Sequence, residues 1–139
     1  MYSPIRWQQR FQNFDKAMNR LERAIRRYQE ASDDELILEG LVQTYEFTYE
    51  LGLNTLRDYL RAEGSLEQIG AKNTIRQALQ FGIIQDGHTW MQAIADRNLT
   101  SHTYNETAAL EVVEGIQERY FDLLKSLYEF FKKEISDGW

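Results

Sequence analysis

The sequence predicts an all-α fold, an antiparallel helical bundle of three long and two short helices. Three observations lead to this prediction. Apolar residues recur at alternating intervals of four and three along three long segments, which is the spacing of one buried helix face. No segment alternates between apolar and polar residues with the period of two that a strand needs. The composition, 42% hydrophobic with a single Pro and eight Gly, excludes a disordered or fibrous chain.

The first predicted helix begins near the N-terminus and carries one narrow apolar seam. Its members are Trp7, Phe11, Phe14, Met18, Leu21, Ile25 and Tyr28. The same region is basic, because residues 1–31 contain seven Lys or Arg and three Asp or Glu, a net charge of +4 that leaves −10 for the remainder. A basic helix on an acidic body is suited to guiding RNA or meeting an acidic partner, and it also fits a solvated face.

The second predicted helix follows a cap supplied by Ser or Asp at residues 32–34. Its main seam consists of Leu38, Val42, Tyr45, Tyr49, Leu53, Leu56 and Leu60. Leu41, Phe47 and Leu51 lie outside this seam, which predicts a helix that is central in its own domain or shared with another subunit. Glu50 is then partly enclosed. Because an enclosed carboxylate needs a partner, we expect it to form a structural salt link.

Two short helices are predicted before the last long one. Asn73 is expected to cap the first, residues 74–81, and Gly82 to end it. Asp86 is expected to cap the second, which should end near Asn98. The last helix is predicted from about residue 106 to 135, with the seam Ala109, Val113, Ile116, Tyr120, Leu123, Leu127 and Phe130.

The composition limits the classes of function. A chain of 139 residues is expected to form one domain over residues 1–139, and no run approaches the roughly 18 apolar residues of a membrane span, so we expect no membrane association. The absence of cysteine removes thiolate chemistry and favours the cytoplasm. With two His and no His-x3-His pair, no metal and no other cofactor is expected. The net charge of −6 argues against a general nucleic-acid coat protein, and DNA is not an expected partner.

One segment carries the chemistry, and it reads Asp96-Arg97-Asn98-Leu99-Thr100-Ser101-His102-Thr103-Tyr104-Asn105. On one continuous helix, Arg97 and His102 would point about 140° apart and would not share a ligand. However, residues 103–106 (Thr-Tyr-Asn-Glu) have the form of a capping box. We therefore expect one helix to end near Asn98 and the next to begin near Thr103, a break that brings the two side chains together.

The predicted corner suits an anion. A helix start presents unpaired N–H groups and a partial positive charge, which favours a phosphate and should lower the pKa of a His102 imidazole placed there. Arg97 adds a permanently charged fork that fits phosphate oxygens. Such a pair is typical of phosphodiester chemistry without a metal. The alternative interpretation is structural: Arg97 complements a helix C-terminus, and His102 caps or packs.

Several segments together resemble a known family. They are Arg6-Trp7, Phe11-x-x-Phe14, Glu46-Phe47-Thr48-Tyr49-Glu50-Leu51, Ile75-Arg76 and Asp96-Arg97-Asn98-Leu99-Thr100-Ser101-His102-Thr103-Tyr104. Over nearly the whole chain they resemble the nucleotidyltransferase substrate-binding proteins of the HEPN superfamily, in which an Arg-x4-6-His motif marks metal-independent ribonucleases. Similar proteins often carry Trp-Lys where this chain has Leu53-Asn54. This difference lies in the second predicted helix, and the Arg-x4-His motif at residues 97–102 is unchanged.

The resemblance implies a toxin paired with a minimal nucleotidyltransferase antitoxin. Members with Arg-x4-His-x-Tyr are similar to toxins whose antitoxin attaches AMP to the motif tyrosine, here Tyr104. The added phosphodiester, two residues from His102, would occupy the place of the RNA phosphate. Without the resemblance, Tyr104 is interpreted as an aromatic staple at a helix start.

The implied enzyme is a two-fold dimer that cuts RNA through the 2′-hydroxyl and leaves a 2′,3′-cyclic phosphate. One His102 acts as base and its symmetry mate as acid, while the Arg97 pair holds the phosphate. Asn98 orients the phosphate or His102, or caps the helix, and Glu50 supports the site. Two alternatives stay open: a non-catalytic subunit that presents a nucleotide or another substrate to a separate nucleotidyltransferase, and a plain dimeric helical adaptor.

Overall fold

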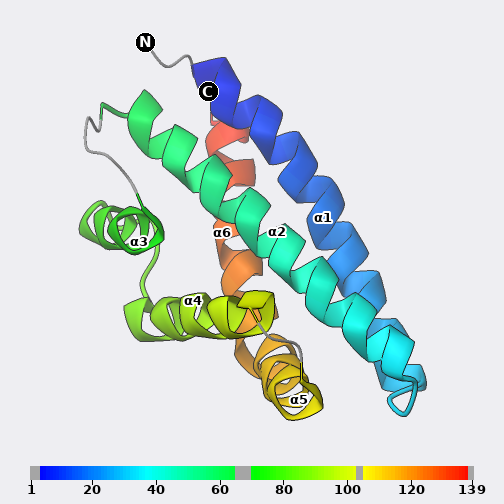
Figure 1. The fold of residues 1–139 in the computed structure, drawn as a ribbon. Helices are drawn as coiled ribbons and strands as arrows, with labels where there is room; N and C mark the ends of the chain where they lie inside the picture. Colours follow the sequence, from blue (N-terminus) through cyan, green and yellow to red (C-terminus); the bar gives the residue numbers. More distant parts are fainter. Residues whose placement is uncertain (1–3, 65–69, 103–104, 138–139) are drawn as a thin grey trace.

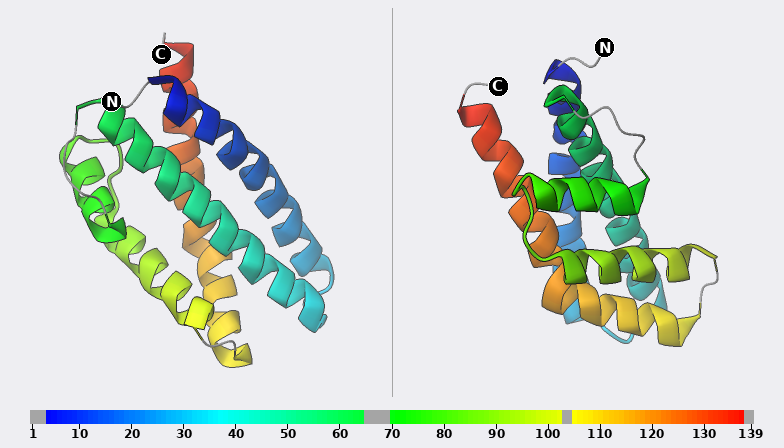
Figure 2. Two further views of the ribbon diagram at one scale, coloured as in Figure 1. Left: turned by 45° about the horizontal axis from the view of Figure 1, so that its top comes forward. Right: turned by 90° about the vertical axis from the view of Figure 1, so that its left-hand side faces the viewer.

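The computed structural model describes the backbone of residues 4–64, 70–102 and 105–137, without the side chains of residues 4, 5 and 99–102. Its elements are α1 (Pro4–Glu30), α2 (Glu35–Ala62), α3 (Ala71–Gln80), α4 (Gly87–His102), α5 (Glu106–Gly115), a π-helical turn η1 (Ile116–Tyr120) and α6 (Phe121–Ser136). The last three follow one another without a break, but the chain bends at η1, so that α5 runs beside α4 and α6 runs along α1 and α2 (Figure 1 and Figure 2). Counted as one continuous helical segment they make up the last long helix, so the predicted three long and two short helices are confirmed. Within the described ranges, no helix is both long and apolar enough to cross a membrane.

The helices α1 and α2 form a long antiparallel hairpin, and α6 packs behind it (Figure 1). In Figure 2, α3, α4 and α5 lie one below another across the axis of α2. The hairpin turn is fixed by Asp34, whose side chain accepts hydrogen bonds from the N–H groups of Leu36 (2.9 Å) and Ile37 (3.4 Å). Asp34 is therefore the cap among the three candidates at residues 32–34, and it sets where α2 begins.

The predicted seams of α1 and α2 meet in one core. Every member of the α2 seam is buried, and α1 contributes the large side chains of Trp7 and Phe14, both fully buried. The Trp7 ring packs against Tyr59 at 5.1 Å and Phe131 at 5.4 Å between centroids. Outside the seam, Leu41 is also buried and Leu51 packs on the core, but the side chain of Phe47 is 58% exposed. The apolar sides of α2 are thus only partly covered within one chain.

The structure corrects the predicted start of α3. The helix begins at Ala71 with Gly70 at the cap position, so Asn73 is not its cap. Asn73 instead lies exposed on the first turn and accepts a hydrogen bond from Arg76 at 3.2 Å. The physical reason is that Ala and Lys at residues 71 and 72 are good helix formers and extend the helix backwards. The predicted end is confirmed, because Gly82 has a φ of +72° and donates to the helix carbonyl of Leu79.

The structure confirms the predicted start of α4 and corrects its end. The Asp86 side chain accepts from the Thr89 N–H (3.1 Å) and hydroxyl (2.7 Å), so it caps α4 as predicted. The helix does not end near Asn98 but continues to His102. No Gly or Pro occurs between these two positions, so nothing in the local sequence forces an earlier end.

The predicted start of the last helix at about residue 106 is confirmed. Residues 103–104 lie outside the described residues, so the capping box expected at Thr103 is not described. The N-cap of α5 is Asn105, whose side chain accepts from the Ala108 N–H at 2.8 Å, and the helix proper begins at Glu106. The Asn105 side chain thereby satisfies one of the free N–H groups at the helix start.

The turn η1 shifts the buried face of the last helix by one residue. The spacing of apolar residues predicts Leu123 and Phe130 in the core. In the structure the fully buried residues are Leu124 and Phe131, while Leu123 and Phe130 are partly buried. A π-helical turn holds one more residue than an α-helical turn, so the residues after 116–120 are rotated about the helix axis. Leu124 and Phe131 therefore replace Leu123 and Phe130 in the core, while Leu127 is buried as predicted.

Candidate functional site

The predicted site is built around an ion pair between α2 and α4. Nη2 of Arg97 lies 2.6 Å from Oε1 of Glu50. The Arg97 side chain is 27% exposed and the Glu50 side chain 45%, so the pair lies at the surface of the helix junction. Because the partners are on different helices, their charge-assisted hydrogen bond fixes the guanidinium relative to α2. The structural salt link expected for Glu50 is confirmed, and its partner is Arg97.

Tyr49 provides an apolar and uncharged neighbour for this pair. Its ring is buried and packs against Trp90 of α4, with 6.4 Å between centroids. Burial raises the pKa of the Tyr49 hydroxyl, the Glu50 carboxylate raises it further, and Arg97 partly opposes the shift. The phenol therefore stays protonated at physiological pH. Removing water from one side of the ion pair lowers the local dielectric constant and strengthens the attraction between Arg97 and Glu50.

A second contact holds the same turn of α4 against the last helix. The Tyr120 hydroxyl donates to Oδ2 of Asp96 at 2.5 Å. The Tyr120 ring stacks on Tyr45 at 5.7 Å, and the Tyr45 hydroxyl donates to the carbonyl of Ala93 at 3.4 Å. Asp96 is the neighbour of Arg97 in the chain, so these contacts also set the position of the candidate site. Sequence reasoning placed Tyr120 in the core and gave no signal for its hydroxyl partner.

The hydrogen bond between Tyr120 and Asp96 gives a testable pH dependence. Burial and then this hydrogen bond raise the pKa of Tyr120 to about 12, whereas an unfolded Tyr titrates near about 10. Tyr120 therefore contributes its full stabilisation below about pH 10 and loses it as the pH rises to about 12, because the unfolded chain releases the proton first. We expect the stability of Tyr120→Phe, measured by urea unfolding, to fall less steeply than wild type over this range.

The control for that measurement is Tyr128→Phe. Burial and the hydrogen bond to Asp15 raise the pKa of Tyr128 to about 12 as well. Tyr128→Phe should therefore flatten the same pH slope. Asp15 lies on α1 and Tyr128 on α6, so this variant should leave the packing of α4 unchanged. An unchanged slope in Tyr120→Phe would contradict the raised pKa of Tyr120, to which burial contributes most and the hydrogen bond to Asp96 next.

The structure contradicts the predicted convergence of positions 97 and 102 through a helix break. Both lie on α4, where residues five apart are about 140° apart around the axis. Position 102 is the last residue of α4 and not the first turn of the next helix. At a C-terminal helix end the dipole favours a positive charge, which is the opposite of the electrostatic environment predicted for His102.

The sequence model of one protein family, described as nucleotidyltransferase substrate binding protein like, matches residues 9–133. The chain belongs to this family. The matched range includes α2, α4 and the motif at residues 96–104, so the resemblance inferred from the motif is confirmed. A curated relative from Haemophilus influenzae, described as a probable ribonuclease HepT, is 36% identical over 86 residues. The match covers 59% of each protein, so the chain spans about three fifths of the length of this relative.

In this member of the nucleotidyltransferase substrate-binding family, two of the five predicted site residues are in contact, Arg97 and Glu50. Asn98 follows Arg97 on α4 and its side chain is exposed. The side chain of His102 and the whole of Tyr104 lie outside the described residues. Within those residues, no group of three His, Asp or Glu is arranged to hold a metal ion. The described part of the site therefore provides a fixed, partly exposed guanidinium, which can bind a phosphate.

Proposed function

We propose that this protein is a metal-independent endoribonuclease toxin whose active site lies at a dimer cleft, and that a partner nucleotidyltransferase silences it by adenylylating Tyr104. The observation that carries the proposal is the contact between Arg97 and Glu50, which holds a partly exposed guanidinium of the Arg-x4-His-x-Tyr motif at the junction of α2 and α4. Family membership and the relative described as a probable ribonuclease support it.

The proposed dimer brings a second copy of Arg97 and His102 to the site. Positions 97 and 102 are about 140° apart around the axis of α4, so the two positions of one chain lie on different sides of the helix. A two-fold axis near α4 brings a second copy of each residue to the shared cleft. The site then contains two His102 imidazoles, which is the number that a base and an acid require.

The reaction uses the 2′-hydroxyl of the RNA as nucleophile. One His102 removes the hydroxyl proton, the 2′-oxygen bonds to phosphorus, and the bond from phosphorus to the 5′-oxygen breaks. The other His102 gives a proton to the leaving 5′-oxygen, so the products are a 2′,3′-cyclic phosphate and a 5′-hydroxyl. Arg97 neutralises charge that builds up on the phosphoryl oxygens. Glu50 holds Arg97 in place, and Asn98 orients the phosphate.

Control by the partner acts on the same site. The Tyr104 hydroxyl attacks the α-phosphate of ATP, loses its proton and releases pyrophosphate. Because Tyr104 is two residues from His102 in the sequence, the AMP so attached places a phosphodiester anion beside the imidazole. The nucleotide occupies the position of the RNA phosphate and repels it. Incubation with the cognate nucleotidyltransferase and ATP should label wild type and leave Tyr104→Phe unlabelled and active.

The ends of the RNA products test the mechanism. Purified protein is incubated with transfer, messenger and ribosomal RNA in EDTA, and the new 3′ ends are examined by mass spectrometry. We expect 2′,3′-cyclic phosphates. New 3′-hydroxyl ends would exclude attack by the 2′-hydroxyl, and intact RNA in all three samples would contradict the ribonuclease proposal.

The description of the matching family favours one second candidate, a non-catalytic subunit that presents a nucleotide or another substrate to a separate nucleotidyltransferase. In that case this chain should raise the activity or the nucleotide affinity of the cognate enzyme, and it should not cleave RNA. Enzyme kinetics of the nucleotidyltransferase with and without the chain distinguish the two candidates.

A further inference from the structure

We propose that the groove between α1 and α2 binds the single-stranded region of the RNA substrate, with a base stacked on Phe47 and phosphates bound by Lys16 and Arg20. The choice of RNA as the ligand rests on the proposed function. The location of the site rests on the shape, the exposed aromatic ring and the charge of this groove, which none of the catalytic steps uses.

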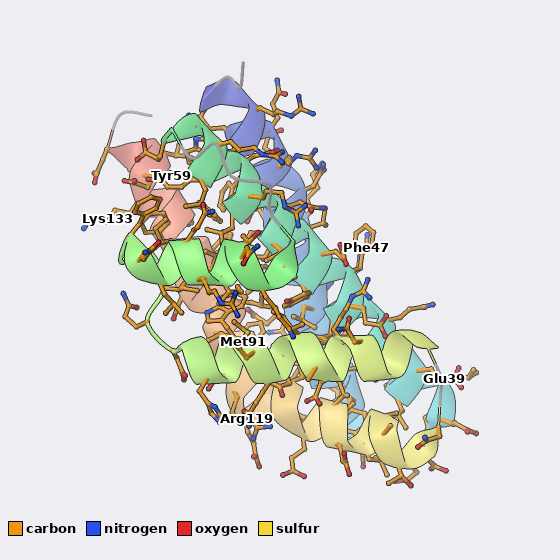
Figure 3. All side chains as sticks on the ribbon, turned by 60° about the vertical axis from the view of Figure 1, so that its left-hand side comes forward. Glu39, Phe47, Tyr59, Met91, Arg119 and Lys133 are labelled. Atoms are coloured by element: carbon orange, nitrogen blue, oxygen red, sulfur yellow. The ribbon has the colours of Figure 1, made fainter. Side chains whose placement is uncertain are left out.

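The groove consists of two neighbouring hollows of about 330 and 360 Å³. Both are lined by Ala17 and Arg20 of α1 and by Phe47 of α2, so they form one continuous surface. Lys16 lines the second hollow, and no described lining residue of either hollow is an Asp or Glu. Figure 3 shows Phe47 projecting from α2 clear of the helix ribbons, and its side chain is 58% exposed.

The groove is the edge of a basic stripe on an acidic protein. Lys16, Arg20, Arg23 and Arg27 are all exposed and follow one another at intervals of four, three and four. On a helix this spacing keeps them within an arc of about 60° and over a length of about 16 Å. Other cations of α1 have nearby carboxylates, since Arg6 and Arg10 contact the buried Asp58 of α2, and Arg26 contacts Glu22 at 3.4 Å. The stripe is therefore the part of α1 that is available to an anion.

The groove is also next to the candidate active site. Phe47 and Glu50 are three residues apart on α2, which makes them neighbours on the helix surface with about 5–6 Å between their Cβ atoms. Glu50 in turn contacts Arg97. An RNA strand with a phosphate at Arg97 can therefore continue past Phe47 into the groove.

The chemistry of the groove favours single-stranded RNA over a protein partner. An exposed aromatic ring beside cations is the combination that binds unpaired bases and the phosphates between them. A comparison within the molecule shows the difference: Phe81 is equally exposed at 59%, but the hollow beside it is lined by Glu63 and Glu134, which repel phosphate.

Binding of a labelled single-stranded RNA to His102→Ala protein, measured by fluorescence anisotropy, tests the proposal without cleavage of the probe. Phe47→Ala in this background should weaken binding by about 5- to 150-fold, the effect of losing one stacked base. Lys16→Gln with Arg20→Gln should reduce the slope of log K against log salt concentration by about 1.4, or about 0.7 for each phosphate that is no longer neutralised.

Matched control variants are available on other faces. Phe81→Ala removes an equally exposed ring, and Lys125→Gln with Lys133→Gln makes the same change in net charge from α6. Both controls should bind RNA as the His102→Ala parent does. Equal losses in the groove variants and the controls would overturn the proposal, because they would indicate general electrostatic attraction.

Two further results separate this proposal from the proposed function. If wild type cleaves RNA while the groove variants bind the probe normally, the groove proposal fails and the ribonuclease proposal stands. If wild type cleaves no RNA while the groove variants lose binding, the groove proposal stands and the ribonuclease proposal fails. Dissociation of the dimer in Phe47→Ala, measured by sedimentation, would overturn the groove proposal in favour of an interface between copies.

Discussion

Replacement of His102 by alanine should lower the rate of RNA cleavage by about 10²- to 10⁴-fold, the usual contribution of a general acid or base. Arg97→Ala should lower it by about 10²- to 10³-fold, since it removes the group that stabilises charge on the phosphoryl oxygens. The Arg97 pair with Glu50 lies at the surface, so its loss should reduce the free energy of unfolding by only about 1 kcal/mol or less. Initial rates and urea unfolding of the same preparations measure the two effects.

The control for Arg97→Ala is Arg76→Ala. Arg76 is an exposed arginine on α3 that contacts Asn73 and lies outside the motif, so its removal should leave the rate unchanged. An excess of His102→Ala protein mixed with wild type should lower the activity by more than dilution alone, because each mixed dimer contains a single His102. Cleavage that persists in both motif variants would contradict the assignment of this site.

Replacement of Phe131 by alanine should lower the free energy of unfolding by about 3–5 kcal/mol. Phe131 is fully buried, and its ring packs against Trp7 of α1 and Tyr59 of α2. Its neighbour Phe130 is only partly buried, so Phe130→Ala should have a smaller effect. Urea unfolding followed by circular dichroism measures both variants under the same conditions.

This pair of variants tests the π-helical turn directly. Without the extra residue in η1, the apolar spacing of the last helix places Phe130 in the core and Phe131 at its edge. A larger loss of stability in Phe130→Ala than in Phe131→Ala would therefore contradict the turn at Ile116–Tyr120. Leu123 and Leu124 differ in the same way and provide a second comparison within the same helix.

Sequence reasoning predicted the features that depend on neighbouring residues. The four-and-three spacing identified three long helices, and the short polar side chains at residues 32–34 and at Asp86 marked the starts of α2 and α4, with the structure selecting Asp34 among the first three. Both features arise from residues that are at most about one helical turn apart, so the local sequence is sufficient to predict them. The need of Glu50 for a partner could also be predicted, because burial of a carboxylate is costly wherever the partner lies.

The ends of helices were harder to predict. Residues 98–102 contain neither Gly nor Pro, and their weak helix propensity permits a break or a continuation. The structure continues α4 to His102, and this decides that Arg97 and position 102 share one helix. The dimeric site was already expected because one chain supplies a single His102, and the continuous helix adds a second reason for it, since positions 97 and 102 of one chain are about 140° apart around α4.

The sequence by itself determined the helix-forming segments, the buried faces of α1 and α2, the family and the motif that carries the proposed chemistry. Only the tertiary structure decided that Glu50 pairs with Arg97, 47 residues away, and that Tyr120 donates to Asp96. It also decided the π-helical turn, where a Cβ atom at Gly115 would lie 2.5 Å from the Tyr120 ring. The physical reason is range: capping and periodicity act within about one helical turn, while these contacts depend on how whole helices pack.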